Sequence, residues 1–205
     1  RSKNQYRLFY TQSGTGAAAQ RGITGTFKIG PNGTPVWEWS ELIGFNVACV
    51  TSNYGEDNVE RQYHGSYNGY VHQHDIGNSF DGDNVRAEFK TPDIDYGDIG
   101  IRKTLHFLKL SLRPEGLSDV KIDVSFDFDD SNVPKLQLGT VTIPPSLFGV
   151  STFGTTVFGG ATIPAKKLNL WGSGFSNNFK FYSNDTNPPY SIQGMYVDLI
   201  PASRR

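Results

Sequence analysis

A short run of strict alternation constrains the fold of this chain more than any other sequence feature. Between Asp119 and Asp129, polar residues alternate with apolar ones, and the apolar positions are Val120, Ile122, Val124, Phe126 and Phe128. Successive side chains of a β-strand point to opposite faces, so this period of two predicts a strand with one apolar face and one acidic, solvated face. The preceding segment repeats the pattern at Leu108, Leu110 and Leu112.

The two alternating segments predict a long β-hairpin. Arg113 to Gly116 lies between them, where the proline presets one backbone torsion and the glycine accepts a positive one, as a turn requires. An amphipathic hairpin must bury its apolar face, so we expect the residues that follow to supply a second, facing sheet.

The composition favours an all-β protein, because the chain has 23 Gly and 11 Pro and no stretch with sustained helical periodicity. The net charge of −1 gives no global attraction for nucleic acid or anionic membrane. No apolar run approaches the roughly 20 residues that a membrane-spanning helix needs. The chain opens on Arg1 without a signal-peptide pattern, and we expect it to be a piece of a longer protein. Cys49 is alone, which excludes an intrachain disulfide and predicts a buried thiol.

The first part of the chain predicts short strands at spacings of about ten residues, joined by turns rich in Gly and Asn. This pattern is typical of sandwiches, barrels and propellers. Gly69 to Asp75 has the form of an inner propeller strand, and the polar segment Gly77 to Asp83 is the best candidate for a domain boundary. The predicted strands are Tyr6 to Thr11, Gly22 to Ile29, Val36 to Leu42, Phe45 to Ser52, Glu60 to His64 and Tyr70 to His74.

A Phe-Gly pair recurs every five residues within Ser146 to Gly160, at Phe148, Phe153 and Phe158. That period fits neither a helix nor a flat strand, so it predicts an extended loop whose rings fill hydrophobic gaps while glycine permits the bends. Exposed aromatic surface of this kind marks interfaces, so we expect the three rings to pack against an adjoining domain or subunit. Further strands are predicted at Leu168 to Trp171, with Trp171 in the core, at Phe175 to Tyr182 and at Tyr190 to Ile200.

Several segments, taken in order, resemble one family. They read NQYRLFYT, VWEWSELIGF, HGSYNGYVHQHDIGNSFDG, FKTPDIDYGD to IGIRKTL, and FGTTVFGG with NFKFYSND…PYSIQGMYVDL. Together they resemble the C-terminal part of the tail nozzle proteins, the tail tubular or stabilisation-type proteins of short-tailed bacteriophages. The resemblance spans nearly the whole chain. It implies partial β-propeller blades over residues 1–82, followed by an antiparallel β-sandwich platform over residues 83–205. Family members are several times longer, so the resemblance implies that remaining blades lie outside this sequence.

The resemblance also implies a function. The chain is expected to be a non-catalytic structural component of the virion tail, assembled in the host cytoplasm and without a cofactor. Copies would form a homo-oligomeric ring that contacts the portal or adaptor and the tail fibre or spike proteins. DNA would pass through this ring during ejection without specific binding. Trp37, Trp39 and the three Phe-Gly rings are the expected interface residues.

His72 and His74 are the sharpest chemical feature of the sequence. An H-x-H pair on a strand places both imidazoles on one face, which is a common metal-ligand arrangement. His64 and Asp75 are near enough in sequence to complete a site. Since no cysteine or E-x-x-H element accompanies them, we interpret the pair as exposed blade residues whose rings stack on their neighbours, and a metal-dependent hydrolase is the weakest alternative.

Two acidic groups invite a catalytic or calcium-binding interpretation. A strand would separate Asp127 from Asp129 by about 7 Å, so the acidic face around them is better read as solvated, and it would repel DNA in a channel wall. Asp93, Asp95 and Asp98 lie among glycines, where Asp caps turns more simply than it forms a catalytic pair. Motifs for a nucleophile or a phosphate loop are missing from the sequence.

The aromatic residues of the first part support a second interpretation. Trp37, Trp39, Tyr63, Tyr67 and Tyr70 can stack on sugars, although packing between blades is the simpler expectation. The alternative function is therefore a carbohydrate-binding or depolymerising module of a tail spike or fibre.

Overall fold

The computed structural model describes residues 4–11, 19–115, 118–130, 132, 136–143 and 166–202. It divides into two compact units, residues 1–77 and 78–205. The regular elements of the described residues are strands, apart from one 3-10 turn, so the predicted all-β class is confirmed. Phe148, Phe153 and Phe158 lie outside the described residues.

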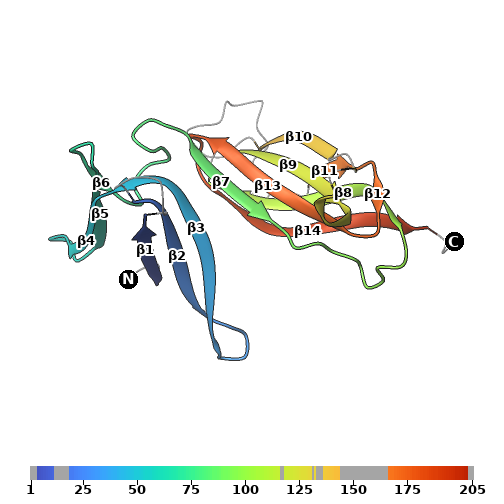
Figure 1. Ribbon diagram of the computed structural model, residues 1–205, viewed down its shortest axis with the longest axis horizontal. Helices are drawn as coiled ribbons and strands as arrows, with labels where there is room; N and C mark the ends of the chain where they lie inside the picture. Colours follow the sequence, from blue (N-terminus) through green and yellow to red (C-terminus); the bar gives the residue numbers. More distant parts are fainter. Residues whose placement is uncertain are drawn as a thin grey trace, which may run out of the picture. The chain divides into compact units, whose positions relative to one another are not determined.

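Unit 1 consists of two three-stranded antiparallel sheets (Figure 1). The first has the order β1-β2-β3 and the second the order β4-β5-β6. A tight turn connects two neighbouring strands in each sheet. In these turns the Gly33 N–H donates to the Gly30 carbonyl at 3.0 Å, and the Gly69 N–H donates to the Ser66 carbonyl at 3.1 Å. The strands are β1 (Gln5–Tyr10), β2 (Ala19–Ile29), β3 (Pro35–Val47), β4 (Cys49–Tyr54), β5 (Glu60–Gly65) and β6 (Val71–Gln73).

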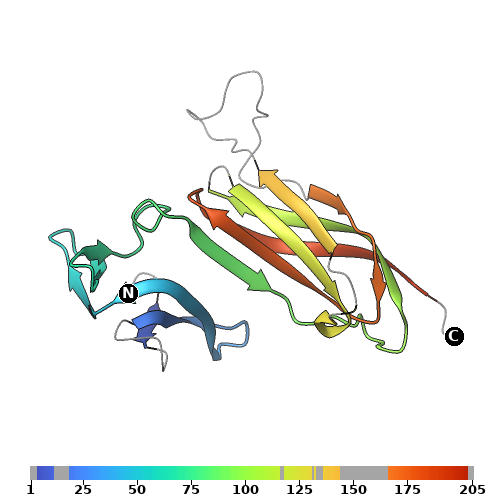
Figure 2. The same ribbon diagram turned by 45° about the horizontal axis from the view of Figure 1, so that its top comes forward.

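Unit 2 consists of two larger antiparallel sheets, seen from a second direction in Figure 2. One has the order β10-β9-β13-β7. In the other, β8 pairs with β14 along one edge and with β11 and β12 along its opposite edge. The elements are β7 (Val85–Lys90), β8 (Lys103–Pro114), β9 (Ser118–Phe126), η1 (Asp127–Asp129), β10 (Leu136–Ile143), β11 (Lys166–Asn169), β12 (Ser173–Gly174), β13 (Asn177–Asp185) and β14 (Tyr190–Pro201).

The predicted hairpin is wrong, because β8 and β9 belong to different sheets. Their apolar faces nevertheless meet in one hydrophobic cluster. The chain crosses from one sheet to the other after Glu115, whose N–H donates to the Pro189 carbonyl at 3.0 Å, and the Ser118 hydroxyl donates to the Pro188 carbonyl at 3.0 Å. The buried cluster comprises Leu105, Leu108, Leu110, Leu112, Val120, Ile122, Val124, Phe126, Val141, Leu170, Phe179 and Phe181.

The alternating strand also ends earlier than its pattern predicts. β9 stops at Phe126, and Asp127, Phe128 and Asp129 adopt positive φ angles of 51°, 60° and 61°. The Asp127 carboxylate accepts the backbone N–H groups of Phe175 at 2.6 Å and Ser176 at 3.3 Å. These hydrogen bonds favour a turn at Asp127 instead of a continuation of the strand. Phe128 is therefore 65% exposed. The expected acidic strand face at Asp127 and Asp129 is therefore absent.

Two predicted burials are also wrong. Trp171 is 72% exposed, and its neighbour Leu170 enters the core instead. β11 ends at Asn169, so the alternation does not continue to Trp171. Cys49 is exposed as well, because it begins β4, a strand whose six residues are all exposed.

The Asp127 turn gives a test of local stability. Asp127→Ala removes an acceptor of two backbone N–H groups and places alanine at a positive φ, so we expect a loss of about 1–2 kcal/mol in the unfolding free energy of unit 2. Asp127→Asn keeps one acceptor oxygen and should lose less. Urea titration followed by circular dichroism measures the difference. Asp130→Ala is the matched control, because the Asp130 carboxylate bonds locally to Asn132; equal losses in the two alanine variants would contradict the capping role.

Candidate functional site

Strand β1 carries its polar residues on the more buried face. Gln5, Arg7 and Phe9 are half-buried, whereas Tyr6, Leu8 and Tyr10 are exposed. The Arg7 side chain is only 13% exposed. A guanidinium withdrawn from water in this way needs paired acceptors, and the second sheet of unit 1 supplies them.

Arg7 joins the two sheets of unit 1. Its Nη2 atom donates to both carboxylate oxygens of Asp75, at 2.9 and 2.8 Å, and to Gln5 Oε1 at 3.0 Å. Its Nη1 atom lies 3.1 Å from His74 Nδ1. Asp75 lies two residues after the end of β6. Its φ angle is 61°, a positive value that aspartate tolerates better than most residues. A residue from β1 thereby holds the end of the β4-β5-β6 sheet.

The bond from Arg7 fixes the tautomer of His74. A guanidinium only donates, so His74 Nδ1 accepts and the ring proton is on Nε2. His74 Nε2 lies 2.8 Å from His64 Nδ1, and in this tautomer it donates to that nitrogen. The His64 ring stacks on His72 with centroids 4.9 Å apart. His74 and His64 thus form a directed pair of hydrogen bonds that begins at Arg7, and His72 adds a stacking contact.

The surroundings of His74 keep its ring uncharged at neutral pH, and those of His64 disfavour its charged form. Burial, with help from the nearby His64 and Arg7, lowers the pKa of His74 to about 4. Burial and the neighbouring His72 lower the pKa of His64. Phe45 stacks on the His74 ring with centroids 5.7 Å apart and parallel planes, which adds to the desolvation. A proton on His74 Nδ1 would break the bond to Arg7 and place two like charges together.

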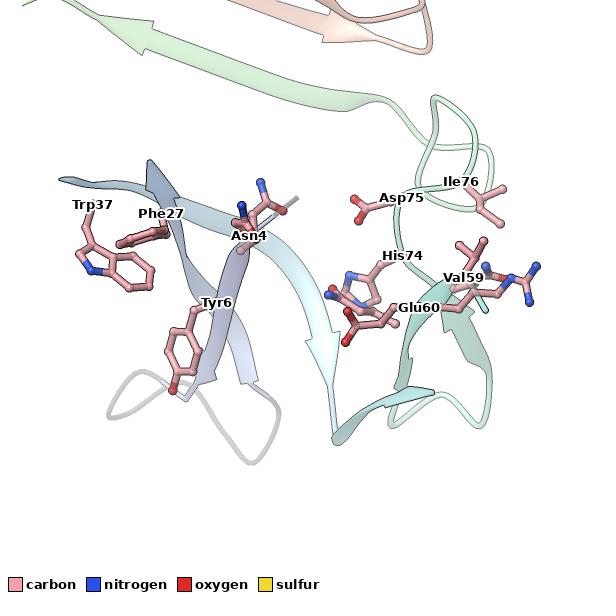
Figure 3. A pocket seen from close by; sticks show the side chains of 13 residues that line it. Asn4, Tyr6, Phe27, Trp37, Val59, Glu60, His74, Asp75 and Ile76 are labelled. Carbon is pink, nitrogen blue, oxygen red and sulfur yellow. The ribbon is translucent and has the colours of Figure 1, made fainter. Parts of the chain in front are cut away.

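A cleft of about 590 Å³ lies beside this network within unit 1. Figure 3 shows the rings of Tyr6, Phe27 and Trp37 on the first sheet, and the side chains of Glu60, His74 and Asp75 on the side of the second sheet. The cleft is lined by Asn4, Gln5, Tyr6, Phe27, Trp37, Val59, Glu60, Arg61, Gln62, Gln73, His74, Asp75 and Ile76.

The two predicted tryptophans have different positions relative to the cleft. Trp37 lines it, whereas Trp39 does not and instead stacks on the Trp37 ring with centroids 5.5 Å apart and an interplanar angle of 18°. Phe27 meets Trp37 edge to face at 5.5 Å. Tyr67 and Tyr70 are exposed, Tyr63 is half-buried, and none of the three lines the cleft. The predicted set of five aromatics is therefore not assembled into one platform.

The structure brings His64, His72 and His74 together with stacked rings, but the interpretation of His72 and His74 as exposed is wrong, because both are half-buried. The short contact between His64 and His74 is a hydrogen bond between ring nitrogens, which occupies the lone pair that a metal would need. Among the described residues, no group of three or more His, Cys, Asp or Glu is arranged to hold a metal ion. Asp95 and Asp98 accept the N–H groups of Gly97 and Gly100, in agreement with the turn interpretation.

Sequence reasoning misses Arg7, although it is central to the network. Its partner Asp75 is 68 residues away, so no local motif links them. The signal available in the sequence is the alternation of β1. Arg7 shares the half-buried face with Gln5 and Phe9, whereas Tyr6 and Tyr10 lie on the exposed face.

Comparisons with protein-family models and with curated proteins found no match. In the described part of the chain, no helix has the length and apolar character needed to cross a membrane. Function is therefore inferred from the geometry of the described residues.

The pair of His74 and His64 predicts a pH dependence for unit 1. The pKa of His74 is about 4 in the folded chain and near 6.5 when unfolded, so between these values the unfolded chain binds a proton that the folded chain does not. Stability is therefore complete above about pH 6.5 and falls as the pH drops towards 4, by roughly 2 kcal/mol after allowance for partial exposure. Tryptophan fluorescence during urea unfolding in a Trp171→Phe background reports on Trp37 and Trp39 alone.

A matched pair of variants separates His74 from a general effect of acid. His74→Gln offers one acceptor and one donor, like the neutral imidazole, but it does not titrate, so the pH dependence should become shallower. His106→Gln, at an exposed ring in unit 2, should keep the wild-type dependence. A His74→Gln slope as steep as that of the wild type would contradict this role of His74.

Proposed function

We propose that this chain is a non-catalytic structural component of a bacteriophage tail, part of a nozzle or tail-tube ring that forms an oligomeric conduit for DNA ejection. The observation that supports this proposal is an exposed aromatic face on the β1-β2-β3 sheet. We define the aromatic face as Tyr6, Leu8, Tyr10, Trp37, Trp39 and Ile43, all of which are exposed.

The sheet register makes this face continuous around Tyr6 and Trp39, whereas the ion pair of Arg21 with Glu41 separates Ile43 from them. Tyr6 pairs with Gly25, and Gly25 pairs with Trp39, so the three lie in one row across the sheet. A Cβ atom on Gly25 would meet the Trp39 ring at 2.5 Å, which means that the indole lies against the glycine backbone. Contiguous apolar surface of this kind marks an interaction site, and its burial would provide the free energy of assembly.

The arrangement of sheets supports the finer fold that we propose. Two open three-stranded sheets in unit 1 fit incomplete propeller blades, whose remaining surfaces would be covered by other blades or other subunits. The hydrophobic cluster shared by the two sheets of unit 2 fits an antiparallel β-sandwich. The proposed position is the virion tail, after assembly in the host cytoplasm.

The proposed neighbours are further copies of the chain, the portal or adaptor, and the tail fibre or spike proteins. DNA would pass without specific binding. Around β7 and β13 the charges are paired, as in Lys180 with Glu88 at 2.9 Å and Lys90 with Asp129, so this surface mixes both signs. Mixed charge favours neither attraction nor strong repulsion of phosphate.

The assembly role predicts that the aromatic face controls oligomerisation. Trp39→Ser removes the most exposed ring of the face and should shift the chain from oligomer to monomer, because less apolar surface is buried on association. Sedimentation velocity over a range of protein concentrations measures this, with negative-stain electron microscopy to look for rings.

Tyr67→Ser is the matched control, because Tyr67 is exposed in unit 1 but lies in the turn between β5 and β6. It should assemble as the wild type does. A wild-type chain that stays monomeric, or a Trp39→Ser variant that assembles normally, would contradict the proposal. Release of reducing sugar from a polysaccharide would instead support the depolymerising alternative. Phe148, Phe153 and Phe158 remain predicted interface residues.

A further inference from the structure

The cleft of unit 1 is lined by an indole ring and by side-chain amides, a combination that subunit assembly does not require. We propose that it binds a neutral sugar unit of a polysaccharide, with Trp37 as the stacking residue and side-chain amides as the hydrogen-bonding partners. This inference rests on the cleft and not on the tail-assembly role, but Trp37 belongs to both the cleft and the aromatic face, so a bound sugar and a neighbouring subunit would compete for this ring.

Trp37 provides a fixed apolar surface in the cleft. Trp37 is 47% exposed, and its ring is in contact with the stacked Trp39 ring and with Phe27 edge to face, each with centroids 5.5 Å apart. A flat indole matches the C–H face of a pyranose ring, which is apolar although the ring edge carries hydroxyl groups. A ring that is already oriented loses little conformational entropy when a ligand stacks on it.

The polar lining suits hydroxyl groups. Asn4, Gln62 and Gln73 contribute three side-chain amides to the cleft, while the amide of Gln5, which also lines it, is already bonded to Arg7 and Thr26. An amide offers both a donor and an acceptor, and a sugar hydroxyl also acts as both, so the two chemistries satisfy each other in several orientations. A ligand with only acceptors or only donors would leave part of this lining unpaired.

The charges around the cleft argue for a neutral ligand. Arg7 is committed to Asp75 at 2.8 Å, and Arg61 to Asp57 at 2.6 Å. His74 is uncharged at neutral pH, since its pKa lies at about 4. An anionic ligand would need to compete with these ion pairs and would meet the carboxylate of Glu60, which also lines the cleft. The volume of about 590 Å³ accommodates roughly one or two sugar rings.

The test is nuclear magnetic resonance of the intact chain, which has three tryptophan indole N–H groups to observe. The probes are three neutral oligosaccharides, maltotriose, cellotriose and lactose, with sialyllactose as the acidic counterpart. At least one neutral probe should shift the Trp37 indole signal with a Kd on the order of 1 mM and leave Trp171 unchanged. The acidic probe should bind more weakly than lactose, because it carries a sialic acid residue with a negatively charged carboxylate attached to the same disaccharide.

Two variants decide whether the cleft is responsible. Trp37→Ala should weaken binding about tenfold or more, and Gln73→Ala should weaken it to a smaller extent. Tyr67→Ala, at an exposed ring outside the cleft, should bind like the wild type, and circular dichroism checks that each variant folds. No shift with any neutral probe up to about 10 mM, a preference for sialyllactose, or unchanged binding by folded Trp37→Ala would overturn the proposal.

Discussion

The two leucine- and valine-bearing strands of unit 2 depend on one constraint, which is that their apolar faces must meet across a shared core. β8 and β9 follow each other in the chain, yet each is hydrogen-bonded to other strands. Because β8 and β9 face each other, both strands bury every second side chain. Phe179 and Phe181 of β13 pack beside these side chains in the same core. β7, β10, β11, β12 and β14 then take positions along the edges that β8, β9 and β13 leave open. The arrangement of unit 2 therefore follows from the burial of these strands.

Unit 1 is held together by different physical means. Of its described apolar residues only Val47 belongs to the buried core set, whereas Thr24 and His64 are buried polar groups. The connection between its sheets relies on Arg7, Asp75 and the histidines, with Phe9 and Phe45 packed around them. A polar connection of this kind is directional, and it costs stability when any member lacks its partner. Its integrity is therefore coupled to protonation in a way that the hydrocarbon core of unit 2 is not.

The sequence allowed part of this structure to be predicted, for reasons visible at single residues. Alternation located Val120, Ile122 and Val124 on a buried face correctly, because side-chain direction is a local property. It did not identify the strands that pair with β9, because pairing depends on where the connection after Glu115 leads. The pattern also continued through Asp127 to Asp129, where backbone N–H groups from a segment 48 residues away instead favour a turn. Of the residues that line the cleft, the sequence pointed only to Trp37, His74 and Asp75, and it did not predict that they share a cleft, because the lining comes from segments far apart in the chain.

The position of β3 at the end of the β1-β2-β3 order has a consequence for how the chain behaves in isolation. A strand of 13 residues at a sheet edge offers its backbone to any other strand that approaches, including the same strand of a neighbouring molecule. Glu38 and Glu41 interrupt its hydrophobic residues and bond to Lys28 and Arg21 on the adjacent strand. Two β3 strands paired edge to edge would bring like carboxylates together, so these charges act against fibrillar self-association. They leave the edge open to a partner strand of complementary charge.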